Sequence, residues 1–335
     1  MLYRSRFAFV VVTACAAVGL HVTATPALTI IPTFDTTITT NSNATYFESQ
    51  INSAISAIDS YIANPVTVDI TFEGVNYGLG SNSLDDGTGL SYSAYVSALK
   101  NHQRLSAADD SALITLPTSF PVPGDTPTNP NQEIGLGSPL ARALGIAFNG
   151  PVGGTVYANL GSMMLPQYST AQNDYRYSMQ SVVAHEIDEI LGIGGDGSSL
   201  STIYYGYSGT LTNANVGPLD LFRYSSDGVR SFTTASNATA YFSINGGKTN
   251  LVNFNQNPNG DYGDWTGTSQ VQNWSGTPGR VLNLGANEMT ALDVVGWNLT
   301  PLGTALETGQ PVPEPATMAI LLCGGLPLLA RRKRS

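Results

Sequence analysis

Four ionisable side chains occur within the five residues 185–189, namely His185, Glu186, Asp188 and Glu189. The cluster stands out because only 11% of the residues are charged and the chain has three histidines. On a helix, at about 100° per residue, His185, Asp188 and Glu189 share one face. Gly192 ends this helix, so the acids fall in its last turns, where the helix dipole disfavours carboxylates. A bound cation relieves that repulsion, and the cluster therefore indicates a metal site.

The spacing is close to His-Glu-x-x-His, in which two histidines one turn apart bind zinc and the glutamate acts as a general base. Here His185 and Glu186 take the first two places, and Glu189 replaces the second histidine. We expect His185 and Glu189 to bind the metal and Glu186 to be the catalytic base. One imidazole with carboxylates is a harder ligand set than is usual for zinc, so calcium or manganese is an alternative. A solvated acidic helix end with a chance His-Glu pair also explains these residues.

The segment also resembles the longer metzincin signature, His-Glu-x-x-His-x-x-Gly-x-x-His. His185, Glu186 and Gly192 match it. Glu189 and Gly195 stand at two of its metal-ligand positions, and glycine has no side chain with which to bind a metal. Asp196, one residue later, is the nearest substitute for the third ligand. The resemblance implies zinc as the cofactor, whereas the calcium alternative rests on the hardness of the ligand set.

The first 24 residues have the features of a secretory signal peptide. Arg4 and Arg6 precede an apolar run that extends from Phe7 to Leu20. Small residues then lead to a cleavage position after Ala24. We therefore expect signal peptidase to remove residues 1–24.

The last 24 residues have three parts in a fixed order. Val312-Pro313-Glu314-Pro315 precedes an apolar run from Ala316 to Ala330, and basic residues follow at 331–334. Residues 312–335 resemble the PEP-CTERM sorting tail of Gram-negative bacteria. The resemblance implies removal by an exosortase-type membrane enzyme and release or attachment at the cell surface, often among exopolysaccharide. The apolar run also predicts a short transmembrane segment.

The composition excludes several classes of protein. The formal net charge is −10, and the central part is more acidic still, because both ends are basic. This charge argues against nucleic acid or an anionic membrane as a partner. Both cysteines, Cys15 and Cys323, lie in the processed ends, so the mature chain has neither a disulfide nor thiol chemistry.

Periodicity and turn residues predict a mixed α+β domain over residues 25–311. We expect helices at 44–63, 91–102, 174–192 and 287–297. We expect strands at 66–72, 155–160, 218–224 and 240–244. The motif helix should present His185, Asp188 and Glu189 to a cleft between two lobes.

Segments outside the motif resemble a PEP-CTERM-associated family of secreted metallopeptidases. These segments are residues 218–225, 241–244, 260–265 and 291–297. The resemblance implies a metzincin-like, two-lobed metallopeptidase fold with an irregular C-terminal lobe. It also implies hydrolysis of a protein or peptide substrate by a metal-dependent peptidase.

Other residues suggest different functions. The stretch from Asn253 to Asp264 has side-chain oxygens that suit calcium, although such a stretch is usually a turn. His102 is the other histidine of the mature chain and is a distant ligand candidate. The competing class is a non-catalytic surface or matrix protein that retains a metallopeptidase fold and uses its aromatic residues to bind polysaccharide, or that holds a structural ion.

Overall fold

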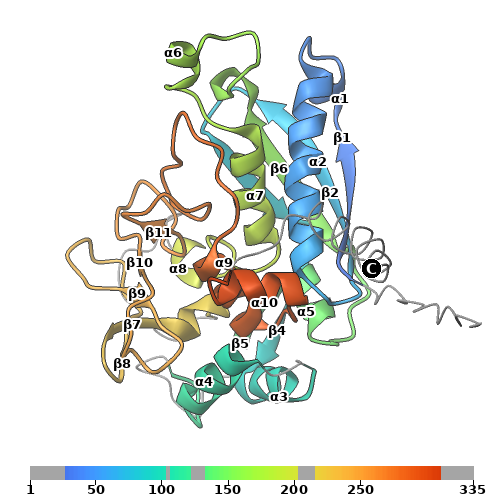
Figure 1. Ribbon diagram of the computed structural model, residues 1–335. Helices are drawn as coiled ribbons and strands as arrows, with labels where there is room; N and C mark the ends of the chain where they lie inside the picture. The colour runs from blue at the N-terminus through green and yellow to red at the C-terminus, as the bar shows by residue number, and fades with distance from the viewer. Residues whose placement is uncertain (1–26, 103–105, 122–132, 203–215, 311–335) are drawn as a thin grey trace, which may run out of the picture.

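The computed structural model describes residues 27–102, 106–121, 133–202 and 216–310 (Figure 1). The predicted signal peptide and sorting tail lie outside these residues. Apolar residues alternate with polar ones along β2 (Thr67–Val75), and Val68, Ile70 and Phe72 are buried. Two parallel neighbours flank β2, namely β1 (Thr29–Phe34) and β6 (Gly153–Asn159). The fourth strand, β3 (Gly80–Leu84), is antiparallel to β6 at the edge of the sheet.

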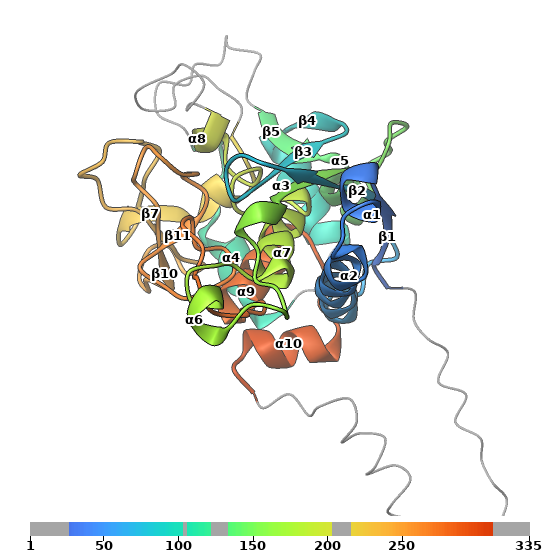
Figure 2. The same cartoon turned by 90° about the horizontal axis from the view of Figure 1, so that it is seen from above.

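Two long helices lie side by side against this sheet (Figure 1). The first, α2 (Ala44–Tyr61), buries a stripe of apolar residues at helical spacing, namely Phe47, Ile51, Ile55 and Ile58. The second, α7 (Met179–Ile190), contains the charged cluster and contacts α2, β3 and β6. Seen from above in Figure 2, α7 lies between the sheet and the later part of the chain. The motif helix is therefore held from several sides.

A second sheet of short antiparallel strands forms from the later part of the chain, in the order β11-β10-β9-β7-β8. Its strands are β7 (Arg223–Ser226), β8 (Val229–Arg230), β9 (Tyr241–Phe242), β10 (Val252–Phe254) and β11 (Trp265–Thr266). Strands this short are held by packing of their side chains. The rings of Phe242 and Trp265 stack with their centroids 5.6 Å apart, and Phe222 and Phe254 pack around them.

The remaining elements connect these layers and cover them. The helices are α1 (Thr36–Thr39), α3 (Tyr92–His102), α4 (Ala107–Thr115), α5 (Ser138–Ala143), α6 (Thr170–Asn173), α8 (Ser199–Thr202), α9 (Ala286–Val295) and α10 (Pro301–Glu307). The 3-10 turns η1 (Leu160–Ser162) and η3 (Leu219–Phe222) and the strand pair β4 (Gly87–Ser91) and β5 (Glu133–Gly137) complete the described elements. The Trp297 indole N–H donates to the Leu191 carbonyl at 2.8 Å, which joins the end of α9 to the end of α7.

The α+β class predicted from the sequence is confirmed. The helices expected at 44–63, 91–102 and 287–297 correspond to α2, α3 and α9 within a few residues. The motif helix is shorter than the predicted 174–192 and begins at Met179. The hydroxyl of Ser178 caps it by accepting from the amide of Ser181 at 3.3 Å. Residues 174–176, predicted as part of the first turn of this helix, form a turn and a bend that follow the separate helix α6.

The prediction of a transmembrane segment is corrected. Within the described ranges, no helix has both the length and the apolar character needed to cross a membrane. The apolar run at 316–330 itself lies outside those ranges. Its length explains the error, because a helix needs about 20 apolar residues to span a bilayer. This run is shorter, and it is interrupted by Gly324, Gly325 and Pro327.

A second group of buried acids lies where α4, α9 and α10 meet. Ser106 donates its hydroxyl to Asp293 on α9, and its amide donates to Asp109 on α4 at 3.0 Å. Burial raises the pKa of Asp109 to about 7, and burial together with Asp109 raises that of Asp293 to about 8. Burial also raises the pKa of Glu307 on α10. The folded protein therefore keeps protons here that the unfolded chain releases near pH 4.

We expect the free energy of unfolding to fall as the pH rises from about 4 to about 8, because the folded state binds more protons in this interval. One such group contributes a slope of at most about 1.4 kcal/mol per pH unit. Asp293→Asn removes one titrating group and should make the slope shallower. Denaturant unfolding across this pH interval measures it, with the exposed Asp227→Asn as the control. An unchanged slope for Asp293→Asn contradicts the expectation.

Candidate metal centre

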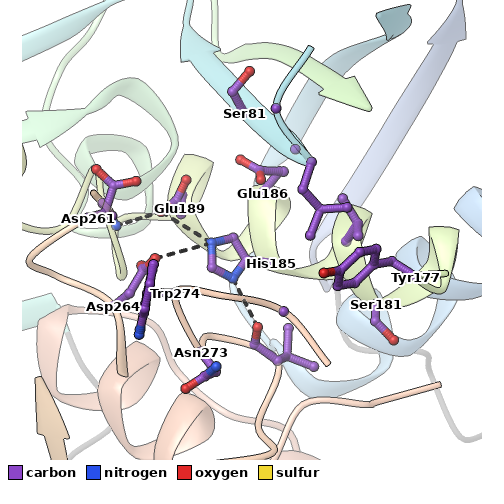
Figure 3. A pocket seen from close by; sticks show the side chains of 18 of the residues that line it. Ser81, Tyr177, Ser181, His185, Glu186, Glu189, Asp261, Asp264, Asn273 and Trp274 are labelled. Carbon is purple, nitrogen blue, oxygen red and sulfur yellow. Dashed lines mark hydrogen bonds and ion pairs between the residues drawn. The ribbon is translucent and has the colours of Figure 1, made fainter. Parts of the chain in front are cut away.

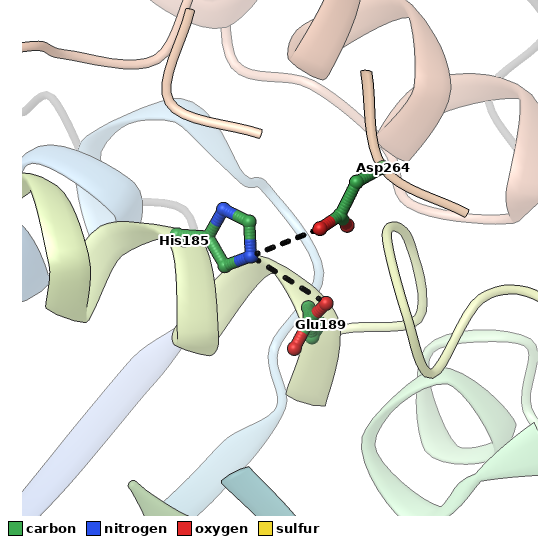
Figure 4. Close-up of side chains that lie close together, drawn as sticks. All are labelled: His185, Glu189 and Asp264. Carbon is green, nitrogen blue, oxygen red and sulfur yellow. Dashed lines mark ion pairs between the residues drawn. The ribbon is translucent and has the colours of Figure 1, made fainter. Parts of the chain in front are cut away.

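Three side chains converge at the C-terminal end of α7 (Figure 4). His185, Glu189 and Asp264 each place one ligand atom within 4.8 Å of the other two, and they form the one such group among the described residues. His185 Nε2 lies 3.6 Å from Glu189 Oε1 and 3.5 Å from Asp264 Oδ2. His185 and Glu189 are one helical turn apart, as the motif predicts, whereas Asp264 comes from the loop before β11. The set of one imidazole and two carboxylates fits a divalent cation.

The hydrogen bonding of His185 leaves the correct nitrogen for a metal. Its Nδ1 lies 2.9 Å from the carbonyl oxygen of Val271. A carbonyl only accepts, so Nδ1 carries the proton and Nε2 faces the two carboxylates. Burial opposes a charged imidazole, but the carboxylates of Asp264 and Glu189 outweigh it and raise the pKa of His185 well above its usual value. Either a proton or a cation is thus required between Nε2 and the carboxylates.

The second ligand, Glu189, is fixed by hydrogen bonds to both of its oxygens. The amide of Gly195 donates to Oε1 at 2.6 Å, and the Asn82 side chain donates to Oε2. Burial opposes ionisation of Glu189, but His185 and the Gly195 amide hold its pKa below its usual value. A Cβ atom at position 195 would lie 2.6 Å from Glu189 Oε1. There is consequently no room at 195 for a third ligand side chain.

The third member of the group, Asp264, is held by residues far apart in the sequence. Gln272 donates to its Oδ1 at 3.0 Å, and the backbone amide of Gln272 donates to Glu288 on α9 at 3.1 Å. The buried guanidinium of Arg223 donates to the carbonyl oxygen of Tyr262 at 2.5 Å, which fixes the loop two residues before Asp264. Outer contacts of this kind orient metal ligands.

Asp196, the third ligand predicted from the sequence, is placed differently. Its side chain is exposed and lines the same cavity, but it is not a member of the converging group. From the sequence, Asp264 is only a possible calcium ligand. Its one signal is its place at the end of the polar stretch from Asn253 to Asp264.

The predicted base, Glu186, lies beside the group without belonging to it. Only 5% of the residue is exposed, and its side chain lines the cavity between β3 and His185 (Figure 3). Asn82 donates to its Oε2 at 3.1 Å. Burial raises the pKa of Glu186 well above its usual value, and the charge of Glu189 raises it further. A Cβ at Gly80 would collide with this carboxylate, so the glycine provides the space it occupies.

The cavity at this site has a volume of about 500 Å³. It is bounded by β3, by α7 and by the chain between 259 and 282. Figure 3 shows Asp261 and Asp264 on one side of His185, with Tyr177 and Ser181 on the other. The described lining residues include five acids and no lysine or arginine. The cavity is therefore acidic, and it lies open beside the converging group.

The expectation that Asp188 faces the cleft is wrong. Asp188 is fully buried and does not line the cavity. Burial and the nearby Glu288 raise its pKa well above the usual value. Neither carboxyl oxygen of Asp188 has a hydrogen-bond partner among the described residues. Helical periodicity placed it on the polar face, but the later part of the chain covers that part of α7.

Among the described residues, the rest of the polar stretch that ends at Asp264 adds no member to this group. Asn255 donates to the carbonyls of Asn257 and Asp261, each at 3.0 Å, and accepts from the amide of Asn257 at 2.8 Å. These bonds are those of a turn that closes on itself, which was the simpler interpretation of the asparagine-rich stretch. His102 ends α3, and its side chain lies outside the described residues.

The comparisons with known proteins supply no relative. No family model, no curated protein and no solved structure matches the chain. The geometry of the site is the remaining guide to function: two candidate ligands lie on a helix, a third lies on a loop, and the carboxylate of Glu186 lies beside them in one cavity.

Proposed function

We propose that the protein is a metal-dependent peptidase. The observation that carries the proposal is the convergence of His185, Glu189 and Asp264 next to Glu186 in one cavity. A divalent cation bound there supplies a Lewis acid for the peptide carbonyl. Glu186 accepts a proton from the attacking water and then delivers it to the nitrogen of the leaving amine. Its enclosure and raised pKa suit a group that alternates between the two protonation states.

Zinc is the metal we propose, with calcium as the alternative. The Nε2 of His185 is oriented as a ligand, and imidazole suits zinc better than calcium. Two carboxylates complete a set of three protein ligands, which is the usual number at a catalytic zinc site. Calcium generally takes six to eight oxygen ligands.

A peptide substrate is supported by the position of β3. Among the described strands, β3 pairs with β6 alone, so its other edge is free for hydrogen bonding. Residues 78–82, on and before this strand, line the cavity. An extended peptide can add to such an edge through its main chain. This edge strand, the motif helix and the irregular later part also support a metzincin-like arrangement.

We propose that the mature protein lies outside the cell, released or held at the surface of a Gram-negative bacterium. Signal peptidase and an exosortase-type enzyme would be its processing partners, and exopolysaccharide its surroundings. The support is the order of features at 1–24 and 312–335. Intact-mass analysis of protein from the native host should give a chain that begins near Thr25 and lacks the tail. Retention of Arg331–Arg334 would contradict the sorting proposal.

The peptidase proposal is tested with the trimmed, zinc-loaded domain and unfolded casein. We expect cleavage that a chelator abolishes and added zinc restores. Zinc binding without any cleavage would refute the peptidase and favour a non-catalytic surface protein. Binding of calcium but not zinc would favour a non-catalytic surface protein that holds calcium as a structural ion.

A further inference from the structure

The side chain of Asn82 reaches from β3 to the two glutamates of the site. Its Nδ2 donates to Glu186 Oε2 at 3.1 Å and to Glu189 Oε2 at 2.5 Å. An amide nitrogen has two hydrogens, and this geometry uses both. If the amide were rotated by about 180°, Oδ1 would face the two carboxylates. An ionised carboxylate only accepts hydrogen bonds, so the orientation with Nδ2 toward the carboxylates is the one that satisfies both contacts.

A donor between Glu186 and Glu189 stabilises the state in which both are ionised. They are three residues apart on α7, which makes them neighbours on its surface, and like charges at this spacing repel. Only 5% and 4% of these residues is exposed, so water screens the repulsion poorly. Asn82 supplies the two N–H groups from a different element of the fold.

The carbonyl oxygen of the Asn82 side chain argues against a role in packing alone. Its Oδ1 is buried and has no hydrogen-bond partner among the described residues. A buried acceptor without a partner is destabilising, and an apolar side chain of the same size would avoid it. The two hydrogen bonds that Asn82 donates to Glu186 and Glu189 offset this unpaired acceptor.

We propose that Asn82 is a positioning residue of this site, which holds Glu189 toward the metal and Glu186 toward the cavity. The part that concerns Glu186 rests on the proposed peptidase function, whereas the part that concerns Glu189 rests on metal binding alone. Because Asn82 belongs to β3, it also fixes both carboxylates relative to the strand whose free edge lines the cavity.

Two substitutions separate donation from packing. Asn82→Leu keeps much of the volume and removes both donors, whereas Asn82→Asp keeps the shape and replaces the donor nitrogen by oxygen. The control is Ser83→Ala, an exposed position on the same strand that does not line the cavity. Each trimmed protein is titrated with zinc against a chromophoric chelator. Values of kcat and KM are then measured on a peptide at saturating zinc.

We expect Asn82→Leu to weaken zinc binding by about 10-fold to 100-fold, the usual effect of removing a partner of a metal ligand. At saturating zinc, kcat should fall by a similar factor, with KM changed less than about twofold. Asn82→Asp should lower kcat at least as much, because it sets a third carboxylate beside two others. A packing role predicts the opposite order, with the isosteric Asp variant close to wild type.

Wild-type zinc affinity and kcat in both variants would overturn the proposal. If the wild type binds zinc and cleaves nothing, the peptidase function fails by itself. The zinc affinities then decide the role of Asn82: weaker binding in the variants supports it, and equal binding overturns it. If circular dichroism shows that Asn82→Leu does not fold, the isosteric Asn82→Asp decides in the same way.

Discussion

Glu186→Gln is expected to lower kcat by roughly two to four orders of magnitude, the usual contribution of a positioned general base. The change keeps the shape of the side chain and removes its ability to accept a proton from water. Zinc content should stay at the wild-type value, because Glu186 is not one of the three converging ligands. Steady-state cleavage of a peptide and elemental analysis of the same preparations measure the two quantities.

The matched control for this substitution is Glu48→Gln on α2, a partly exposed glutamate that does not line the cavity. It should cleave at the wild-type rate. If the Glu186→Gln protein cleaves as fast as the control, Glu186 is not the general base. Loss of zinc from Glu186→Gln would make Glu186 a ligand instead.

Asp264→Asn and Asp196→Asn should differ sharply in their effect on metal binding. Asp264 places a carboxylate oxygen in the same group as His185 and Glu189, so loss of its charge should weaken zinc binding by at least about 100-fold. This effect exceeds the usual cost of removing a residue that only hydrogen-bonds to a metal ligand. Asp196 is exposed at the rim of the cavity, and its substitution should change the affinity less than about threefold.

Competitive zinc titration of the two proteins decides which aspartate is the third ligand. The reverse order of affinities would restore Asp196, the residue next to the motif, as that ligand. Loss of binding in both variants would require a site that uses both carboxylates.

The sequence predicted those parts of the fold and site that depend on local spacing. The stripe of apolar residues in α2 and the one-turn separation of His185 from Glu189 follow from helical geometry. Asp264 could not be found in this way, because its loop reaches α7 through the packing of the second sheet and the contacts of Gln272. The prediction that Asp188 faces the cleft was wrong for a related reason. Helical spacing places Asp188 on the polar face, but residues distant in the sequence bury it.

The three candidate ligands come from two different parts of the fold, since α7 packs on the first sheet and Asp264 directly precedes β11 of the second. A cation held by both is a cross-link between them. Ligand binding stabilises the native state by about 4 kcal/mol when the free ligand is at 1,000 times its Kd. We therefore expect removal of such a cation to weaken the cooperativity of unfolding, with the second sheet opening before the first. Under the proposed function, the supply of metal is then expected to set how well the chain resists proteolysis, including digestion by other copies of itself.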